Sequence, residues 1–267
     1  MPSIARATVN TVTPTDITPK EDFLAIEEPL EIRLEYGPEQ PRSTRPLSVT
    51  MRTPGEDEDL VRGFLLTEGI VQSPADILSV STLSENVVLA RLSPAAQFDM
   101  QRLDRHFYTT SSCGVCGKTS IEAVLAGGHC KSRAPRKINI DKEVIYSLPE
   151  TLRRQQSAFD QTGGIHASAL FDINGNLLAL REDVGRHNAL DKLIGHISSE
   201  NATLFEESVL LLSGRASFEL LQKAAVAGIP LVCAVGAPSS LAVETARAFG
   251  ITLIGFLRGE RFNMYTD

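Results

Sequence analysis

The sequence predicts an α/β fold in which a small α+β unit precedes a larger domain with parallel strands. Toward the C-terminus, three apolar runs alternate with two helical segments: residues 209–212, 217–227, 231–235, 239–249 and 251–256. This β-α-β-α-β order requires parallel strands joined by right-handed crossovers. Ahead of it, an Asn-Gly step between two strand-like runs is a strong signal for a β-hairpin. The larger domain is therefore expected to combine a hairpin with parallel strands.

Length, charge and hydropathy exclude several classes of protein. The 267 residues are enough for one large domain or two smaller ones with apolar cores. The formal net charge of -7 argues against nucleic acid or an anionic membrane as a partner, because both need a basic surface. No run approaches the roughly 20 apolar residues that span a bilayer. Residues 1–20 lack the apolar segment of a secretory signal, so we expect a cytoplasmic protein.

The first third of the chain predicts an arm followed by a compact unit. Residues 1–20 are polar and rich in Thr and Pro, which is typical of a flexible N-terminal arm. Four strand-like runs form two predicted hairpins: residues 30–34 with 47–51, and 77–80 with 87–92. A helix is expected to begin after Pro54, with acidic residues in its first turn, and to end at Gly69. These elements predict a small α+β domain over residues 21–104.

The middle of the chain predicts a loop and the start of the larger domain. Residues 105–118 are polar and contain a C-x-x-C pair, Cys113 and Cys116, which indicates a mobile loop. A capping box begins at Thr119, so a short helix is expected there and the α/β domain is expected to cover residues 119–267. The elements expected before the parallel strands are helices at 142–159 and 184–197 and strands at 165–171 and 177–181.

The C-x-x-C pair has several interpretations. A zinc site needs two further Cys or His ligands, for which His106, His129 and Cys130 are near in sequence. A redox dithiol normally lies on a thioredoxin-like turn, which the surrounding sequence does not match. A persulfide carrier needs an accessible thiol of low pKa on a flexible segment, which Lys118 and the flanking glycines favour. Two exposed thiols without function are the remaining alternative. Cys233, within an apolar run, is expected to be a buried hydrophobe.

Loops at the carboxyl ends of the three parallel strands predict a phosphate site. These loops contain Ser213, Gly214 and Arg215, then residues 236–240, then residues 256–261. Ligands bind at this edge of open α/β sheets, and free N–H groups at helix starts suit phosphate oxygens. Arginine can pair with phosphate through two hydrogen bonds. Ordinary turns with solvated arginines are the alternative, and no loop has the glycine spacing of a dinucleotide or P-loop motif.

Polar residues are dense at one strand-to-helix junction. Asp183 and His187 there are candidates for an acid/base or orienting pair. Alternatively, Asp183 caps the helix while Arg186 and Lys192 stay solvated. His166, which follows two glycines, is a candidate for either a core imidazole or a catalytic one.

Six segments are distinctive as a set that runs in order along the chain. They are Thr67-Glu68-Gly69-Ile70, Cys113-Gly114-Val115-Cys116-Gly117, Thr162-Gly163-Gly164-Ile165-His166-Ala167, Asp183-Val184-Gly185-Arg186-His187-Asn188-Ala189-Leu190-Asp191-Lys192, Ser213-Gly214-Arg215 and Asn263-Met264-Tyr265. Together they resemble the formate dehydrogenase accessory sulfurtransferases, the FdhD/NarQ family.

The resemblance implies a fold, a reaction and partners. The family fold is similar to that of cytidine deaminases, a three-layer α/β/α sandwich with a mixed sheet. A member takes persulfide sulfur from a cysteine desulfurase and delivers it to molybdenum bis(pterin guanine dinucleotide), which is then inserted into formate dehydrogenase. Guanosine diphosphate is the expected mimic of the bound cofactor. The deaminase analogy also suggests a homodimer.

The resemblance assigns roles to individual residues. The persulfide is expected on Cys113, with Cys116 as the second catalytic cysteine, although electrostatics near the following helix start would favour Cys116. The residues expected to bind the cofactor are Ser213, Gly214, Arg215, His187, Phe256, Leu257, Arg258, Gly259, Glu260 and Arg261. No metal ligands are expected.

Two other functions remain as alternatives. The protein is in one case a non-enzymatic chaperone of the molybdenum cofactor, whose cysteines grip a metal or a partner. In the other it is a zinc-dependent, deaminase-like hydrolase, which needs H-x-E ahead of P-C-x-x-C. In this chain Ser168 takes the place of that Glu after His166, Ser112 precedes the cysteine pair, and the order of the two motifs is reversed.

Overall fold

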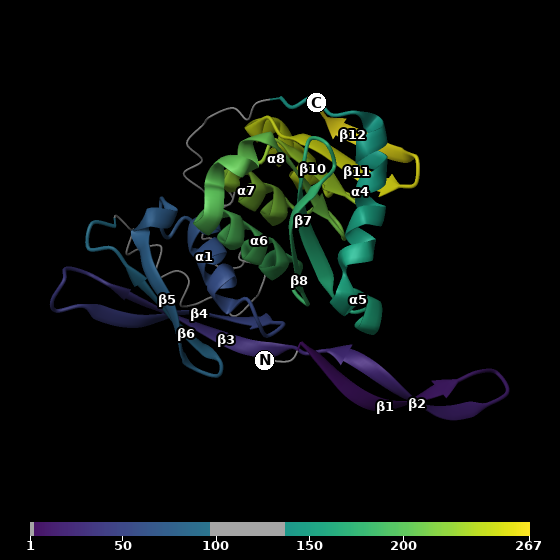
Figure 1. Cartoon of the computed structure of the whole chain (residues 1–267), viewed down its shortest axis with the longest axis horizontal. Helices are drawn as coiled ribbons and strands as arrows, with labels where there is room; N and C mark the ends of the chain where they lie inside the picture. The colour runs from purple at the N-terminus through teal and green to yellow at the C-terminus, as the bar shows by residue number, and fades with distance from the viewer. Residues whose placement is uncertain (1–2, 97–136) are drawn as a thin grey trace.

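The computed structural model describes residues 3–96 and 137–267. Both cysteines of the C-x-x-C pair, the loop predicted at 105–118 and the helix expected from Thr119 lie outside these ranges. The described residues form a two-stranded ribbon, a four-stranded sheet with one long helix, and a six-stranded sheet with helices on both faces (Figure 1).

The N-terminal residues form an antiparallel ribbon of two strands. It consists of β1 (Ile4–Val12) and β2 (Ile17–Ala25), and the amide of Thr13 donates to the carbonyl of Asp16 at its turn. The prediction of a flexible arm over residues 1–20 is therefore wrong for residues 4–12 and 17–20, which belong to paired strands. Frequent Thr, Val and Ile favour a strand, but most side chains on both faces are exposed, so no buried face produced an apolar pattern.

The next unit is a four-stranded sheet that one helix covers. Its elements are β3 (Glu28–Tyr36), β4 (Ser43–Arg52), α1 (Asp57–Thr67), η1 (Pro74–Asp76), β5 (Ile77–Ser84) and β6 (Val87–Leu92). Both predicted hairpins and the predicted helix are confirmed. Parallel pairing of β3 with β6 joins the hairpins in the order β4-β3-β6-β5, and α1 packs its apolar side on the resulting core.

The larger unit contains a mixed sheet in the order β12-β11-β10-β9-β7-β8. The strands are β7 (His166–Asp172), β8 (Leu177–Asp183), β9 (Ser208–Leu212), β10 (Leu231–Ala234), β11 (Thr252–Arg258) and β12 (Arg261–Thr266). The predicted parallel trio β9, β10 and β11 and the predicted β7–β8 hairpin are confirmed. β12, which pairs with β11 in antiparallel fashion at one edge, was not predicted.

Helices cover both faces of this sheet and make a three-layer α/β/α arrangement. The helical elements are α4 (Lys142–Gln155), α5 (Ser157–Thr162), α6 (Arg186–Asn201), η3 (Ala202–Glu207), α7 (Phe218–Ala227) and α8 (Ser240–Phe249). Figure 1 shows α4 on the opposite face from α6, α7 and α8, and each face has its own apolar core. The single helix expected at 142–159 is divided at Gln156 into α4 and α5. None of the described helices has the length and hydropathy that a bilayer crossing requires.

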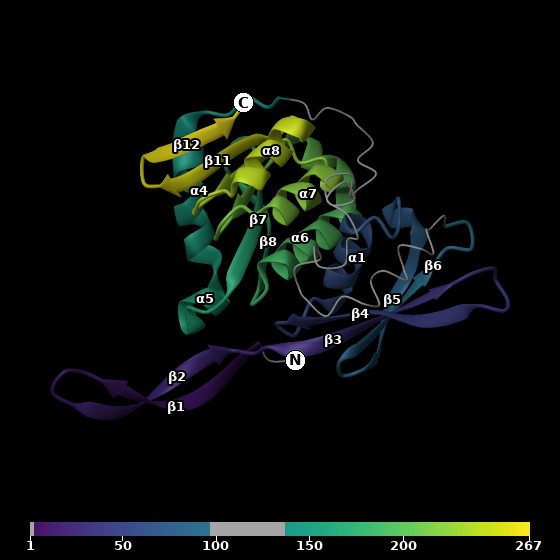
Figure 2. The same cartoon turned by 180° about the vertical axis from the view of Figure 1, so that it is seen from behind.

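The two units meet where α1 crosses α6 at two glycines, and the helices lie side by side in both views (Figures 1 and 2). A Cβ atom on Gly63 would lie 1.8 Å from the carbonyl oxygen of Asp191. A Cβ atom on Gly195 would lie 1.9 Å from the carbonyl oxygen of Asp59. The helix backbones therefore touch directly, which is possible only where side chains are missing.

A buried ion-pair cluster lies beside this crossing. The Lys223 ammonium on α7 donates to both carboxylate oxygens of Asp191, at 3.0 and 2.9 Å, and to Glu68 at 2.9 Å. Thr67 donates its hydroxyl to Asp191 at 2.7 Å. Burial alone would lower the pKa of Lys223, but the two carboxylates raise it above its ordinary value. The cluster thus joins the end of α1 to the larger unit, and each of its carboxylates is paired with the Lys223 ammonium.

We predict that Gly195→Ala destabilises the protein. A methyl group at the crossing must push α1 away from α6, which costs about 1–3 kcal/mol and outweighs the gain of roughly 1 kcal/mol in helix propensity. The measurement is urea unfolding followed by circular dichroism. Gly164→Ala is the matched control, because its Cβ atom would meet nothing closer than 3.8 Å. Equal stability of the two variants would contradict the close crossing.

Candidate functional site

The junction between β8 and α6 is fixed by a buried carboxylate, that of Asp183, which is 0 % exposed. It accepts hydrogen bonds from the backbone amides of Gly185 at 2.8 Å and Thr53 at 3.1 Å. The Lys192 ammonium, itself buried, lies 2.9 Å from it. Burial raises the pKa of Asp183 above its ordinary value, and the charge of Lys192 opposes this rise. Asp183 therefore holds the β4–α1 turn against the start of α6.

Two further side chains of segment 183–192, those of Asn188 and Lys192, also attach the start of α6 to the end of β4 and the turn that follows it. Asn188 donates its amide to the carbonyl of Met51 at 2.7 Å, and its oxygen accepts from the Thr50 hydroxyl at 3.2 Å. Lys192 donates to the carbonyl of Thr53 at 2.9 Å. The expectation of a solvated Lys192 is therefore wrong, because this side chain is 1 % exposed and ties the two units together.

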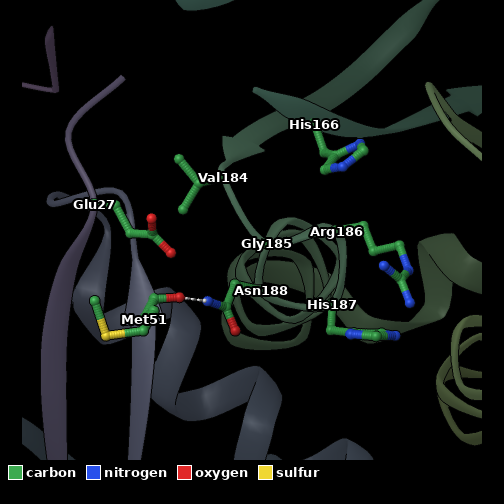
Figure 3. A pocket seen from close by; sticks show the side chains of 8 residues that line it. All are labelled: Glu27, Met51, His166, Val184, Gly185, Arg186, His187 and Asn188. Atoms are coloured by element: carbon green, nitrogen blue, oxygen red, sulfur yellow. Dashed lines mark hydrogen bonds between the residues drawn. The ribbon is translucent and has the colours of Figure 1, made fainter. Parts of the chain in front are cut away.

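Two side chains of the motif, Arg186 and His187, line a cavity at the N-terminus of α6. We name it the α6 cavity; it has a volume of about 300 Å³, and its lining is drawn in Figure 3: Glu27, Met51, His166, Val184, Gly185, Arg186, His187 and Asn188. Among the described residues, no carboxylate lies within ion-pair distance of Arg186. In Figure 3 the Arg186 and His187 side chains stand on one side of the cavity, with His166 above them and Glu27 opposite.

The start of α6 is suited to an anion. The Ncap residue is Gly185, no side chain caps the helix, and its first turn contains no acidic residue. The first amides of a helix lack partners within the helix and carry partial positive charge. With Arg186 and two imidazoles nearby, this end of α6 can bind phosphate or carboxylate oxygens.

His187 pairs with a residue that the sequence did not single out. Its Nε2 lies 2.7 Å from a carboxylate oxygen of Glu219 in the first turn of α7, although the ring is not aligned for a hydrogen bond. The predicted partner, Asp183, instead has its oxygens occupied by backbone amides and Lys192. Glu219 had no signal in the sequence because it lies 32 positions further along a separate helix.

His166, at the start of β7, lines the same side of the α6 cavity as Arg186 and His187. Burial lowers its pKa, the charges of Arg186 and His187 lower it further, and Asp183 opposes them. A Cβ atom on Gly214 would lie 3.3 Å from Nδ1 of this ring. The loop after β9 therefore comes close to the α6 cavity through His166.

Ser213 and Arg215 of that loop, both predicted to bind the cofactor, differ in their surroundings. The Ser213 hydroxyl oxygen accepts from the amide of Ala167 on β7 at 2.9 Å, so it holds two strands together. Arg215 is exposed. The carbonyl of Gly214 accepts from the amide of Gly236 at 2.9 Å, which continues the contact to the loop after β10. The edge loops of adjacent strands are thus linked through their backbones.

The predicted segment 256–261 lies at the far end of this edge. Phe256 has a left-handed backbone (φ 54°), is partly exposed, and donates its amide to the carbonyl of Gly236 at 3.0 Å. Leu257 is 0 % exposed and packs in the core, so its side chain is not available to a ligand. Arg258 and Arg261 are exposed and face each other across the β11–β12 turn. None of these residues lines the α6 cavity.

A second cavity of about 390 Å³ lies beside the β4–α1 turn. Its charged groups already have partners: Lys192 pairs with Asp183, and Glu182 accepts from the amides of Ala158 and Phe159 at the start of α5. We therefore regard the α6 cavity as the candidate binding site.

Two further observations concern cysteine and metal chemistry. Cys233 is completely buried in β10, as expected, and burial raises the pKa of its thiol. No group of three or more His, Cys, Asp or Glu side chains within residues 3–96 and 137–267 is arranged to hold a metal ion.

We predict that Arg186→Ala raises the pKa of His166. Removing the guanidinium removes one of the charges that disfavour the imidazolium, while burial keeps the pKa below the ordinary value of 6.5. The measurement is the pH dependence of the imidazole proton signals by NMR, with His166→Gln to assign the resonance. Arg258→Ala is the control, since Arg258 lies outside the α6 cavity. An unchanged His166 titration in Arg186→Ala would contradict the arrangement.

Comparisons with known proteins place the chain in a family. The FdhD/NarQ family model matches residues 25–267. The chain is 47% identical over 260 residues to the sulfur carrier protein FdhD of Mycobacterium tuberculosis, covering 92% of this chain and 91% of that protein. It is 46% identical over 259 residues to the sulfur carrier protein FdhD of Streptomyces coelicolor, covering 93% and 89%.

A solved structure has the same fold. It comes from Desulfotalea psychrophila, and its description assigns it to formate dehydrogenase as an accessory protein. The TM-score is 0.77 at 23% identity, with 100% of this chain and 98% of that chain covered. The family model spans all of the described units except the N-terminal ribbon, and the chain belongs to the FdhD/NarQ family.

Proposed function

We propose that the chain is a sulfur carrier that binds molybdenum bis(pterin guanine dinucleotide) and serves formate dehydrogenase. The relatives named above are described as sulfur carriers, and the structural relative as an accessory protein of formate dehydrogenase. The observation from the structure that supports a nucleotide-bearing cofactor is the α6 cavity, where an uncapped helix start meets Arg186 and two imidazoles. A pyrophosphate is the part of that cofactor which fits such a set of donors.

The proposed carrier step takes place at Cys113. Its thiolate attacks the outer sulfur of a persulfide on the cysteine desulfurase, and a new S–S bond forms as the old one breaks. The desulfurase cysteine leaves as a thiolate, so no electron is gained or lost in this step. Cys113 then carries the persulfide to the molybdenum cofactor, which is the acceptor substrate. Both cysteines of the pair lie outside the described residues.

The proposed cofactor would extend along the edge of the sheet at the carboxyl ends of its parallel strands. A Cβ atom on Gly185 would lie 3.1 Å from the side-chain nitrogen of Asn188, and one on Gly214 would lie 3.3 Å from Nδ1 of His166, so a side chain at either position would crowd residues that line the α6 cavity. Arg258 and Arg261 remain candidates for a more distant part of a large ligand, since both are exposed at the same edge. The α6 cavity would then hold the phosphate groups of the cofactor.

We predict that Cys113→Ala abolishes sulfur loading. The chain is incubated with a cysteine desulfurase and sulfur-labelled cysteine, and the label is located by mass spectrometry of tryptic peptides. The wild-type chain is expected to carry the label on the peptide with Cys113, and Cys233→Ser, whose thiol is buried, is the control. Absence of label from wild-type Cys113 with an active desulfurase would contradict the carrier. Full maturation of formate dehydrogenase by Cys113→Ala would instead favour a non-enzymatic cofactor chaperone.

We predict that guanosine diphosphate raises the melting temperature. At a concentration of 100 times Kd, a ligand that binds only the folded state stabilises it by about 2.7 kcal/mol, or roughly 5–10 °C for a chain of this size. Arg186→Ala should reduce the shift most, because its charge is in the α6 cavity; Ser213→Ala and Arg258→Ala should reduce it less. Lys20→Ala on the ribbon is the control. An equal shift in Arg186→Ala and the wild type would place the nucleotide elsewhere.

A further inference from the structure

Two pairs of polar side chains connect α6 to α7, about one helical turn apart. His187 on α6 faces Glu219 on α7, with Nε2 2.7 Å from a carboxylate oxygen. One turn later in each helix, Asp191 faces Lys223, and the ammonium lies 2.9 Å from the carboxylate. Residues four apart share one face of a helix, so the same faces of α6 and α7 carry both pairs.

The buried pair sets the position of the pair beside the α6 cavity. The Lys223 ammonium reaches both oxygens of Asp191 and also binds Glu68 at the end of α1. Sliding or turning α7 would leave these buried charges without partners, which is strongly unfavourable. The contact between Glu219 and His187 is therefore fixed by the ion pair one turn below it.

Glu219 and His187 have few other partners. Their side chains are only 15% and 13% exposed, and in residues 3–96 and 137–267 Glu219 makes no other ion pair. Nε2 of His187 is itself buried without an aligned hydrogen bond. A largely buried carboxylate requires a donor, and rotation about the soft Cβ–Cγ bond of the imidazole turns its N–H group toward the carboxylate. Glu219 is thus placed to accept a hydrogen bond from Nε2.

This contact determines which ring nitrogen is left for a ligand. In Figure 3 the ring of His187 extends away from Glu27, which stands on the opposite side of the α6 cavity. Since Nε2 is beside Glu219, Nδ1 is the nitrogen available to a ligand in that cavity. A carboxylate only accepts hydrogen bonds, so it keeps the N–H group at Nε2. An imidazole between two anions binds a second proton and donates from both nitrogens.

We propose that Glu219 is a positioning residue for anion binding in the α6 cavity: it holds Nε2–H of His187, so that Nδ1–H of the imidazolium donates to a phosphate oxygen. This inference rests on the proposed function in taking the pyrophosphate of a nucleotide-bearing cofactor as the ligand. The second proton of the ring comes from solvent when the anion binds, and no covalent bond to carbon, sulfur or phosphorus changes.

The groups around the ring give Glu219 a specific task. Arg186 lies next to His187 in α6, and His166 faces the same cavity from β7. The charge of Arg186 disfavours a second proton on the neighbouring imidazole, whereas the carboxylates of Glu219 and Asp183 favour it. Asp183 is already engaged by Lys192 and by backbone amides. Glu219 is therefore the carboxylate in direct contact with the ring that offsets Arg186.

Simple charge repulsion predicts the opposite effect of removing Glu219. If its carboxylate acted only through its negative charge, Glu219→Gln would strengthen the binding of an anion. If it positions His187, the same variant weakens binding. A carboxylate in the first turn also stabilises α7 by itself, and that role does not depend on His187. The sign of the effect and its dependence on His187 therefore separate the three roles.

The test is the dissociation constant of inorganic pyrophosphate and of guanosine diphosphate for the full chain, by isothermal titration calorimetry. Glu219→Gln should raise both constants about tenfold, as should His187→Gln, and the double variant should show no further loss. Glu150→Gln is the matched control: it removes the same charge from an exposed position on α4, on the opposite face of the sheet, and should leave both constants unchanged.

Proton uptake is a readout that a purely structural role would not change. Titrations in buffers of different ionisation enthalpy give the number of protons bound with the ligand. The wild type should take up more protons than His187→Gln, and Glu219→Gln should match His187→Gln. Tighter or unchanged binding in Glu219→Gln, or a loss that persists in the His187→Gln background, would overturn the proposal.

Nitrogen NMR of the ligand-free chain tests the contact without any ligand. In the wild type the neutral His187 ring should carry its proton on Nε2, and Glu219→Gln should lose this preference because an amide both donates and accepts. A tautomer that ignores Glu219, with normal nucleotide binding, would overturn the positioning role alone. A wild type with the expected tautomer that binds neither pyrophosphate nor guanosine diphosphate would instead contradict the proposed function.

Discussion

The arrangement of the two units depends on the hydrogen bonds and the ion pair of one buried carboxylate, that of Asp183. A carboxylate that is 0 % exposed is tolerated only if hydrogen bonds and an opposite charge replace its water. Here each replacement comes from a different place in the fold: Thr53 from the turn before α1, Gly185 from the start of α6 and Lys192 from about two turns later in α6. The need to satisfy one buried charge thereby sets the position of the four-stranded unit relative to the six-stranded sheet.

The same constraint leaves the start of α6 open. Because Asp183 is turned inward, it does not cap the first turn of the helix, and the Ncap position is a glycine. Arg186 and His187 follow directly and line the α6 cavity with His166. A short, densely polar segment can thus contain both the side chains that dock two units and the side chains that attract an anion. The two kinds of side chain are separated because successive residues of a helix point to different sides of its axis.

α6 is the element that both units share, and its burial is unusual for a helix with this composition. Asp191 and Lys192 are adjacent, yet each is nearly fully buried in a separate cluster, the first with Lys223 and the second with Asp183. Between these clusters Gly195 allows the backbone of α1 to approach. The helix is consequently covered on most of its surface, and a partner charge has to be supplied for each charged side chain that it buries.

The elements that could be predicted from the sequence are those with a strong local signal. Apolar runs separated by helical segments predicted β9, β10 and β11, and turn residues predicted the hairpins β3–β4, β5–β6 and β7–β8. The sequence did not reveal the ribbon β1–β2, which has no buried face, or the edge strand β12. Which polar residues of segment 183–192 are structural depends on the folded chain, because Asp183 and Lys192 also bond to Thr53, which is about 130 to 140 positions away. The same holds for the position of His187 beside Glu219 and for the burial of Leu257 in the core. Local sequence sets backbone preference and periodicity, whereas the burial of a charge is set by whatever distant residues surround it.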